Sequence, residues 1–368
     1  MEFNGLLKKI REAHENMLPF AVFRYPESKK VCAYVQHGDE LFLTRDFKTS
    51  GFVMAPFELS DDAVIFPNEN SDYITSSFDN KDIFIGKKPF DSEDSVPKEG
   101  REVYLGLVRK AIAKIQTGEC QKIVVSRSEE VETGELDIVI LLKKLIVTYP
   151  SALVYIWFHP KIGMWVGATP ETLLITEGKK FKTMSLAGTQ KYEGSKNVKW
   201  GPKEIEEQRI VTRHIEDELS DLPIDSGDTY TVRAGNLLHL CNEINGRFGK
   251  EIQLKGLIDR LHPTSAVCGL PRLNAMDFIR SEENYKRNYY TGFLGEINQK
   301  NIVSQGPDAN DTVFSKLYVN LRCMELTPKE STKATLYIGG GITDKSDPDS
   351  EWYETVQKSL IMKTILFG

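Results

Sequence analysis

Residues 153–176, LVYIWFHPKIGMWVGATPETLLIT, hold three β-rich runs that are separated only by turn-like segments. The runs cover residues 153–158, 164–167 and 172–176. A parallel α/β fold would need a helix between successive strands, and these gaps are too short for one. We therefore expect an α+β protein in which neighbouring strands are antiparallel.

Helical patterns flank this stretch on both sides. Apolar residues recur at helical spacing over residues 101–116. Similar patterns predict the helices 138–147, 202–219, 274–281 and 348–367. Further strands are expected at residues 122–126, 316–323 and 334–338.

The first 85 or so residues alternate short β-rich runs with turn signals, which is typical of an antiparallel sheet. The runs are residues 19–25, 31–36, 40–43, 52–57 and 63–66. Between residues 86 and 100 the composition changes to Lys, Pro, Asp, Ser and Glu, which indicates an exposed connection. We therefore divide the chain into a β-rich subdomain, 1–95, and a larger core, 96–368, that together form one integrated unit.

The composition excludes several classes of protein. The formal charge of -6 over 368 residues comes from interspersed acids and bases, so no basic stripe is available for nucleic acid. No run of about 18 apolar residues predicts a membrane span. Residues 1–17 form an amphipathic pattern without the apolar segment of a signal peptide. We expect neither a nucleic-acid nor a membrane partner.

Five cysteines are widely spaced and never form a CxxC pair. This spacing predicts free thiols in a reducing cytoplasm, and neither a disulfide framework nor a zinc site. The residues are Cys32, Cys120, Cys241, Cys268 and Cys323.

Lys122 interrupts an apolar, strand-like run, QKIVVSR. A lysine among β-branched residues is partly desolvated, which lowers its pKa and lets it act as a base near neutral pH. Alternatively, its long side chain reaches solvent from a strand end. The segment alone leaves both interpretations open.

Two predicted helices carry glutamates on their apolar faces. Glu351 and Glu354 share a face with Lys358, and Glu204 and Glu207 share one in the other helix. Buried acids are rarely tolerated without a partner. Four carboxylates without histidine or cysteine suit a hard cation such as Mg²⁺. The alternative is that these glutamates pair with lysines.

Several other positions are candidates for binding or catalysis. The triple glycine 339–341 follows a predicted strand, and its amides suit an anion, although a simple turn or bulge is the commoner explanation. Arg322, expected within strand 316–323, suits bidentate carboxylate binding or a structural ion pair. Glu171 lies at a proline turn between strands, where desolvation would make it an acid; the alternative is an ordinary turn glutamate in contact with water. His239 and His262 are more typical of core histidines.

Taken together, these segments resemble the chorismate-utilising enzymes, which include isochorismate synthase, salicylate synthase and the first components of anthranilate and aminodeoxychorismate synthase. The resemblance runs from about residue 100 to the C-terminus. It rests on residues 121–127, 167–174, 186–189, 203–207, 262–264 with Gly269, 290–292 with Gly295, 322–323, 339–342 and 351–358.

The resemblance implies two large, orthogonally packed antiparallel sheets with helices outside. It also implies a site in which Mg²⁺ bridges the substrate and Glu207 and Glu354, with Glu204 and Glu351 beside them. Holders of the substrate carboxylates and walls of the pocket would be Ala187, Gly188, His239, Ala266, Arg322, Gly339, Gly340 and Lys358. One departure is Gln208, where many relatives have histidine.

Two positions distinguish the members by their nucleophile. Amine-forming relatives usually have a glutamine-like residue in place of Lys122, because ammonia needs no base. Aminodeoxychorismate synthases commonly have a nucleophilic lysine in place of Ala187. Both positions indicate water as the nucleophile, with Lys122 as base and Glu171 as acid, and isochorismate as the product. Such an enzyme would serve menaquinone or siderophore biosynthesis.

Alternatives remain within this interpretation. Salicylate synthases share the lysine and then eliminate pyruvate, and Ala266 favours the simple synthase because salicylate-forming relatives tend to have threonine there. Anthranilate synthase is disfavoured, so no glutaminase partner is expected. Outside the family, a desolvated Lys122 would suit Schiff-base chemistry.

Overall fold

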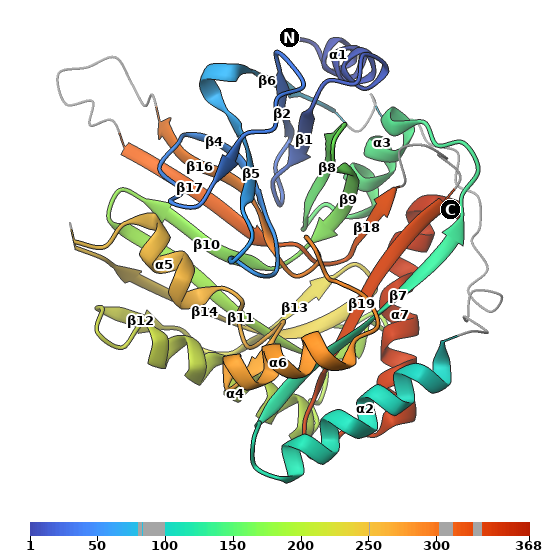
Figure 1. Ribbon diagram of the computed structural model, residues 1–368, viewed down its shortest axis with the longest axis vertical. Helices are drawn as coiled ribbons and strands as arrows, with labels where there is room; N and C mark the ends of the chain where they lie inside the picture. The colour runs from blue at the N-terminus through green and yellow to red at the C-terminus, as the bar shows by residue number, and fades with distance from the viewer. Residues whose placement is uncertain (80–82, 84–99, 250, 302–311, 327–332) are drawn as a thin grey trace.

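The computed structural model describes residues 1–79, 83, 100–249, 251–301, 312–326 and 333–368, and its strands form two large sheets (Figure 1). Every pairing between the described strands is antiparallel, as predicted. The α+β class is therefore confirmed.

The first sheet has nine described strands, which come from both the N-terminal and the C-terminal parts of the chain. Its order in space is β15 (Gly269–Leu270), β7 (Lys122–Glu132), β19 (Lys333–Ile342), β18 (Cys323–Leu326), β9 (Gly163–Thr169), β8 (Leu153–His159), β1 (Phe20–Arg24), β2 (Lys30–Gln36) and β6 (Ser71–Ser77).

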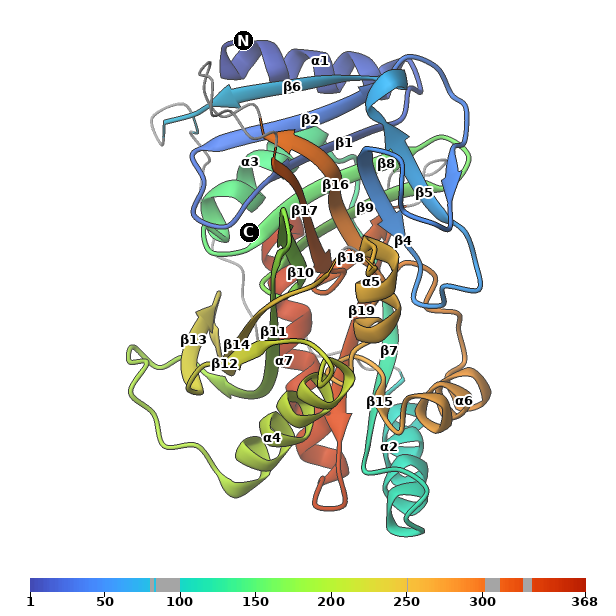
Figure 2. The same cartoon turned by 90° about the vertical axis from the view of Figure 1, so that its left-hand side faces the viewer.

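The second sheet has ten described strands, and its strands β16 and β17 run across the direction of β1, β2 and β6 (Figure 2). The order is β12 (Ile224–Ser226), β14 (Leu237–Arg247), β11 (Lys180–Lys191), β10 (Thr172–Glu177), β17 (Thr312–Val319), β16 (Phe293–Asn301), β4 (Gly51–Ala55), β5 (Ala63–Pro67) and β3 (Leu43–Thr44), and β13 (Tyr230–Ala234) pairs with β14. Strands of the first 80 residues thus belong to both sheets.

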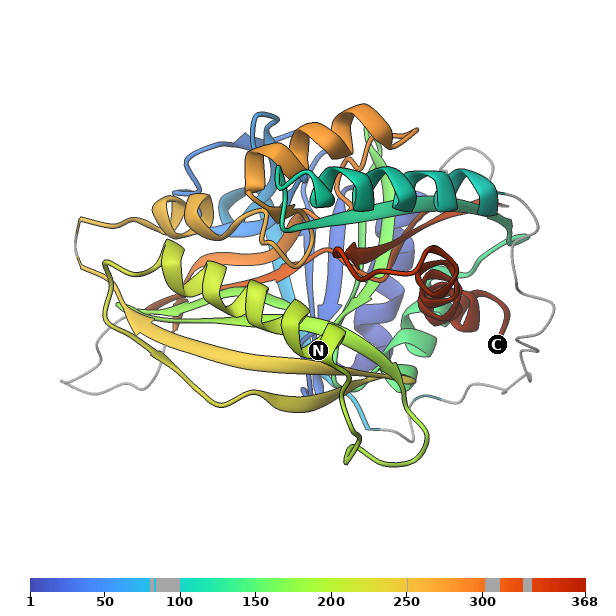
Figure 3. The same ribbon diagram turned by 90° about the horizontal axis from the view of Figure 1, so that it is seen from below.

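Helices cover the outer faces of the sheets. In Figure 3, α4 lies along β11 and β14. The helices are α1 (Phe3–Glu15), α2 (Arg101–Gln116), α3 (Ile138–Thr148), α4 (Pro202–Glu218), α5 (Leu254–Leu261), α6 (Arg272–Glu282) and α7 (Pro348–Phe367), with a short 3₁₀ turn η1 (Asn68–Asn70). No helix of the described chain is long and apolar enough to cross a bilayer.

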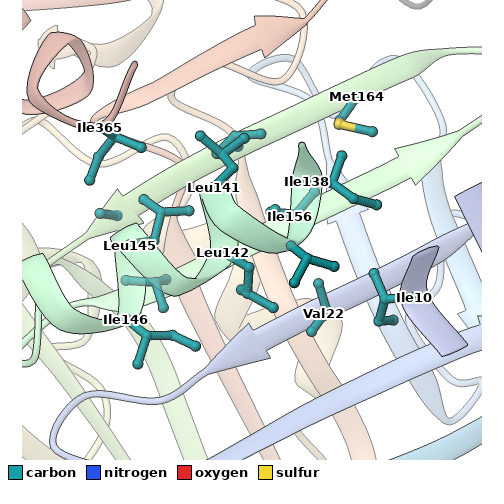
Figure 4. Packing of buried hydrophobic residues seen from close by; sticks show 14 of the residues in the cluster. Ile10, Val22, Ile138, Leu141, Leu142, Leu145, Ile146, Ile156, Met164 and Ile365 are labelled. Carbon is teal, nitrogen blue, oxygen red and sulfur yellow. The ribbon is translucent and has the colours of Figure 1, made fainter. Parts of the chain in front are cut away.

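The apolar core is divided into layers by the sheets. Aromatic residues such as Phe23, Phe52 and Trp157 fill the space between the two sheets. On the outer face of the first sheet, Leu142 of α3 packs with Val22 and other residues of β1, β8, β9, α1 and α7 (Figure 4). These layers hold both sheets in fixed positions because close-packed interiors resist displacement.

The predicted helices are confirmed, with small differences at their ends. The predicted segment 138–147 begins where expected because the Asp137 carboxylate caps α3, accepting the N–H groups of Val139 and Ile140. The long strands β11, β14 and β16 were missed by the sequence analysis, since polar residues and glycines interrupt their apolar pattern. The prediction of a strand at 40–43 is wrong apart from its last residue, which begins β3.

The prediction of one continuous strand at 316–323 is wrong. The chain leaves β17 after Val319 and enters β18, in the other sheet, at Cys323. Arg322 lies in this crossing segment with a positive φ of 49°. Asn320 secures the crossing because it accepts a hydrogen bond from Tyr155 and donates one to the Tyr289 carbonyl.

The triple glycine also differs from expectation. Gly339, Gly340 and Gly341 lie inside β19, paired with β7, and none has a positive φ. They therefore form neither an anion-binding nest nor a turn, because the regular ladder uses their extended backbone. The predicted subdomain boundary at 95/96 lies outside the described residues.

Candidate active site

One pocket is lined by residues from both sheets and from α4 and α7. It brings together most of the residues that the sequence analysis singled out, although they are spread over nearly 190 positions of the chain. These residues are Glu171, Ala187, Gly188, Glu207, His239, Ala266, Arg322, Gly339, Gly340, Glu354 and Lys358. Lys122, Glu204 and Glu351 lie outside this lining.

Lys122 is the first residue of β7 and is completely buried. Its Nζ atom lies 2.9 Å from Oε1 of Glu207, a pocket-lining residue of α4. Burial alone would raise the pKa of Glu207, but Lys122, Lys203 and Lys358 outweigh burial and lower it. The interpretation of Lys122 as a surface lysine is therefore wrong, because its side chain points into the protein.

Glu171 connects β9 and β10 and is only 3% exposed. Burial raises the pKa of its carboxyl group to about 8, even though the positive charges of Lys122, Arg322 and Lys358 act in the opposite direction. A carboxyl group with this pKa is largely protonated at neutral pH. The pocket therefore contains an acid that carries a proton, and the alternative of a solvated turn glutamate is wrong.

Arg322 and His239 contact each other at the wall of the pocket. A guanidinium NH2 group of Arg322 donates to Nε2 of His239, and the other terminal nitrogen donates to the Ala234 carbonyl over 3.3 Å. Burial lowers the pKa of Arg322 to about 10, so the guanidinium stays charged at neutral pH. Burial, together with Arg322 and Lys358, lowers the pKa of His239 well below its ordinary value.

Lysines pair with the carboxylates of α7. Lys203 of α4 lies 2.5 Å from Glu351, and Lys358 lies 2.8 Å from Glu354 within α7. Burial and the neighbouring Glu354 raise the pKa of Glu351, while Lys203 lowers it. In the described part of the chain, no three acidic, histidine or cysteine side chains converge as a ligand cluster. Glu351 and Glu354 thus each have a lysine partner.

The glycines of β19 nevertheless leave room for a cation beside these carboxylates. A Cβ atom on Gly340 would lie 3.5 Å from Oε2 of Glu351, 3.9 Å from Oε1 of Glu354 and 3.4 Å from the Tyr104 hydroxyl. Oε2 of Glu351 and the Tyr104 hydroxyl are buried and have no hydrogen-bond partner among the described residues. Unpartnered oxygens at one point fit the oxygen-rich coordination that Mg²⁺ prefers.

Glu204 and Gln208 lie at the edges of this arrangement. Oε2 of Glu204 lies against Gly201, the residue before α4, since a Cβ atom there would be 2.5 Å away. The Gln208 amide donates to the hydroxyl of Ser185 in β11 over 2.8 Å. Gln208 thus ties α4 to the second sheet.

Two residues with evident contacts to the site were missed by the sequence analysis, namely Lys203 and Tyr104. The sequence analysis included Lys203 only as the first residue of the segment 203–207, and Tyr104 only as an apolar position of the predicted helix 101–116. A lysine at i−1 of a suspected acidic pair is the signal that would have identified Lys203. His262 is a buried core histidine, as expected, whose Nε2 lies 3.0 Å from the Phe57 carbonyl.

A larger, more open hollow of about 740 Å³ lies between α2 and β7. Its charged lining is mainly acidic, and it contains none of the predicted site residues. The smaller pocket is therefore the candidate active site.

The sequence of this chain is similar to one family of known proteins and to several of its characterised members. The chorismate binding enzyme family matches residues 75–367. The isochorismate synthase EntC of Escherichia coli is 28% identical over 278 residues, which cover 71% of this chain and 66% of that protein. The vibriobactin-specific isochorismate synthase of Vibrio cholerae is 29% identical, covering 67% and 61%. Anthranilate synthase component 1 of Thermococcus kodakarensis is 25% identical, covering 70% and 59%. The chain thus matches less than two thirds of the length of these relatives.

Solved structures share the fold. The putative 2,3-dihydroxybenzoate-specific isochorismate synthase DhbC of Bacillus anthracis superposes with a TM-score of 0.76 at 21% identity, covering 98% of this chain and 99% of that one. The menaquinone-specific isochorismate synthase MenF of Escherichia coli gives 0.74 at 19% identity, covering 95% and 88%. At these identities the likeness establishes the architecture of two sheets with flanking helices.

Proposed function

Because the chain belongs to the chorismate binding enzyme family, we propose that it is an Mg²⁺-dependent isochorismate synthase, which converts chorismate to isochorismate. The observation that carries the proposal is that Lys122 and Glu171 are both buried at the same site. The lysine is completely buried beside the pocket, and the glutamic acid lies within its electrostatic influence. A base and a protonated acid at one site are what addition of water with loss of a hydroxyl group requires.

In this mechanism Lys122 acts as the base. Its unprotonated amine takes one proton from a water molecule as the water oxygen forms a bond to C2 of chorismate. Both double bonds of the ring shift by one position, and the electron pair of the bond from C4 to its hydroxyl group leaves with the hydroxyl oxygen. The 2.9 Å contact of Nζ with the pocket-lining Glu207 supports this role, because it places the amine at the edge of the pocket.

Glu171 completes the proton balance. Its carboxyl group donates a proton to the departing C4 hydroxyl, which leaves as water. One water molecule is therefore consumed and one released, and the net reaction is an isomerisation. The raised pKa of about 8 supports this role, because the proton is present before the reaction begins.

Substrate binding is assigned to the positive and polar groups of the pocket. Arg322 and Lys358 would hold the two carboxylates of chorismate, with Gly339 and Gly340 beside them in the wall of the pocket. Ala187, Gly188, His239 and Ala266 would form the remaining walls, and all of them line the pocket. Charge-assisted hydrogen bonds from a buried guanidinium are among the strongest available to a carboxylate.

Mg²⁺ would be held by Glu207, Glu351 and Glu354, with Glu204 nearby, and when bound it would neutralise and orient a substrate carboxylate. The unpartnered Oε2 of Glu351 supports this assignment. Lys122, Lys203 and Lys358 neutralise the same carboxylates in the protein alone.

Water as the nucleophile has further consequences. The enzyme would need no glutaminase partner to supply ammonia, and its product would feed menaquinone or catechol siderophore biosynthesis. The named relatives include enzymes specific for each route. Five buried free cysteines support placement in a reducing cytoplasm.

The direct test is incubation with chorismate and Mg²⁺ in water that contains heavy oxygen, followed by chromatography and mass spectrometry. Isochorismate carrying one heavy oxygen atom is expected. Anthranilate formed on addition of ammonia would contradict the assignment of Lys122. A covalent adduct of Lys122 trapped by borohydride would instead indicate Schiff-base chemistry.

Salicylate synthase is the second candidate, because Lys122 and Glu171 would serve its first step equally well. Ala266 lines the pocket, which favours release of isochorismate if a larger side chain at this position promotes pyruvate elimination. Salicylate and pyruvate in the same chromatogram would establish the second candidate.

A further inference from the structure

His239 lies opposite an irregularity in the neighbouring strand. The pairing of β14 with β11 shifts register between Ala187 and Gln190, so Gly188 and Thr189 bulge out of the ladder. Gly188 has a positive φ of 66°, and a Cβ atom there would lie 3.1 Å from Cβ of Glu204. The bulge turns the Gly188 carbonyl toward the imidazole ring, whose Nδ1 lies 2.8 Å away.

This contact fixes the tautomer of His239. A carbonyl oxygen only accepts hydrogen bonds, so Nδ1 must carry the proton that is donated to Gly188. The Thr189 hydroxyl, 3.4 Å from Nδ1, is the other polar neighbour on that side. The low pKa of His239 keeps the ring neutral, so Nε2 carries a lone pair. Arg322 supplies the N–H group that this lone pair accepts.

Neutral groups alone hold the Arg322 guanidinium. Its described hydrogen-bond partners are the imidazole of His239 and the carbonyl of Ala234, both from the β13–β14 hairpin. Among the described carboxylates, none lies within ion-pair distance of Arg322. A guanidinium oriented by neutral acceptors keeps its full charge available for an anionic ligand, whereas a carboxylate partner would neutralise it.

We propose that His239 is a positioning residue that aims Arg322 at a carboxylate of the substrate by accepting a guanidinium N–H at Nε2, with the Gly188 carbonyl fixing the ring. This inference rests on the proposed function, since it assumes that Arg322 binds the substrate carboxylate. It gives His239 a role in substrate affinity, beyond that of a pocket wall, and no role in proton transfer.

The test compares two amide variants of His239, each of which keeps one of the two hydrogen bonds that the imidazole makes. In His239→Gln the side-chain oxygen reaches the position of Nε2 and can still accept from Arg322. In His239→Asn the shorter amide reaches only the position of Nδ1 and can still donate to Gly188. Chorismate binding is measured by calorimetry with Mg²⁺ in the Glu171→Gln background, in which turnover is slowed.

We expect His239→Asn to weaken chorismate binding roughly tenfold to hundredfold, which is the usual loss for a hydrogen bond to a charged group. His239→Gln should stay within about threefold of the parent. Equal losses in both variants, no loss in either, or a loss confined to His239→Gln would overturn the inference.

The same measurement in a variant that lacks the Arg322 guanidinium tests whether His239 acts through Arg322. In Arg322→Gln, the further change His239→Asn should have no added effect on chorismate affinity, because the group that it positions is absent. An undiminished effect in that background would overturn the inference. If the parent Glu171→Gln protein binds no chorismate at all, the proposed function fails instead, and the two failures are distinguishable.

Discussion

Nζ of Lys122 lies 2.9 Å from Oε1 of Glu207, and the lysine is completely buried. The same amine that we propose as the base is thus paired with a proposed ligand of the metal. Binding of Mg²⁺ by Glu207 would compete with this pair. The contact therefore links metal binding to the position of the proposed base.

Replacement of Lys122 tests its proposed role as the general base. Lys122→Gln should lower kcat by roughly 10²–10⁴-fold, because the water would lose its general base. Steady-state rates of isochorismate formation measure the effect. Lys333→Gln, at a lysine that is 45% exposed and pairs with Glu132, is the matched control and should retain the parent rate. Full activity in Lys122→Gln would exclude the lysine as base.

The pH dependence of the rate should report Glu171. Because burial raises the pKa of this acid to about 8, the protonated form is present below that pH and is lost above it. We expect kcat/KM to fall as the pH rises beyond about 8. Glu171→Gln, which cannot donate the proton, should reduce kcat by roughly 10²-fold or more.

Stability measurements give an independent check on the same group. A pKa that is higher in the folded state stabilises the fold at pH values below the ordinary value, and this contribution is lost as the pH rises toward about 8. Glu171→Gln has no such loss. Its free energy of unfolding relative to the parent should therefore increase by up to about 1.4 kcal/mol per pH unit across this window. Parallel curves in urea unfolding would contradict the buried, protonated acid.

Removal of the metal should abolish turnover. Chelation is expected to stop isochorismate formation, and added Mg²⁺ should restore it. Glu351→Gln should weaken Mg²⁺ binding in calorimetry by at least about tenfold, since a carboxylate ligand becomes a neutral amide. Glu243→Gln, which changes a carboxylate of β14 paired with Lys182, should bind Mg²⁺ normally. Equal affinity in both variants would remove Glu351 from the site.

Gly341 should tolerate no side chain. A Cβ atom there would lie 2.2 Å from Oε1 of Glu207 and 2.8 Å from Cε of Lys122. We expect Gly341→Ala to displace this pair and to lower kcat at least about tenfold. Gly106→Ala in α2 is the control, because no described atom beyond its chain neighbours and its own helix backbone lies within 4 Å of its Cβ position. The control should gain roughly 0.5–1 kcal/mol of stability with an unchanged rate.

A buried ion pair positions the strand that carries Lys122. Arg287 donates to the Val124 carbonyl of β7 and to Glu283, and Glu283 accepts the backbone N–H of Ser126 over 2.8 Å. Arg287→Met should destabilise the fold by about 3–5 kcal/mol, because it leaves Glu283 buried without its charge partner. Urea unfolding measures this. The double variant with Glu283→Gln should recover part of the loss, and no recovery would contradict a coupled pair.

Most of the architecture was predictable from local patterns. The helices followed from apolar periodicity and from caps such as Asp137, and the antiparallel sheets followed from short turns between β-rich runs. Strands β11, β14 and β16 were not predicted, because their interruptions by polar residues resemble loops until a partner strand satisfies their backbone. The break at Arg322 was equally invisible, since an apolar run gives no sign that it changes sheets.

The sequence by itself determined the α+β class, the family and the identity of the chemical groups, because residue type and spacing along the chain express these directly. Only the tertiary structure decided that Lys122 is buried against Glu207, that Glu171 is a protonated acid, and that His239 holds Arg322. The physical reason is that desolvation and hydrogen-bond partners depend on segments distant in the chain, and these set the charge and direction of a side chain.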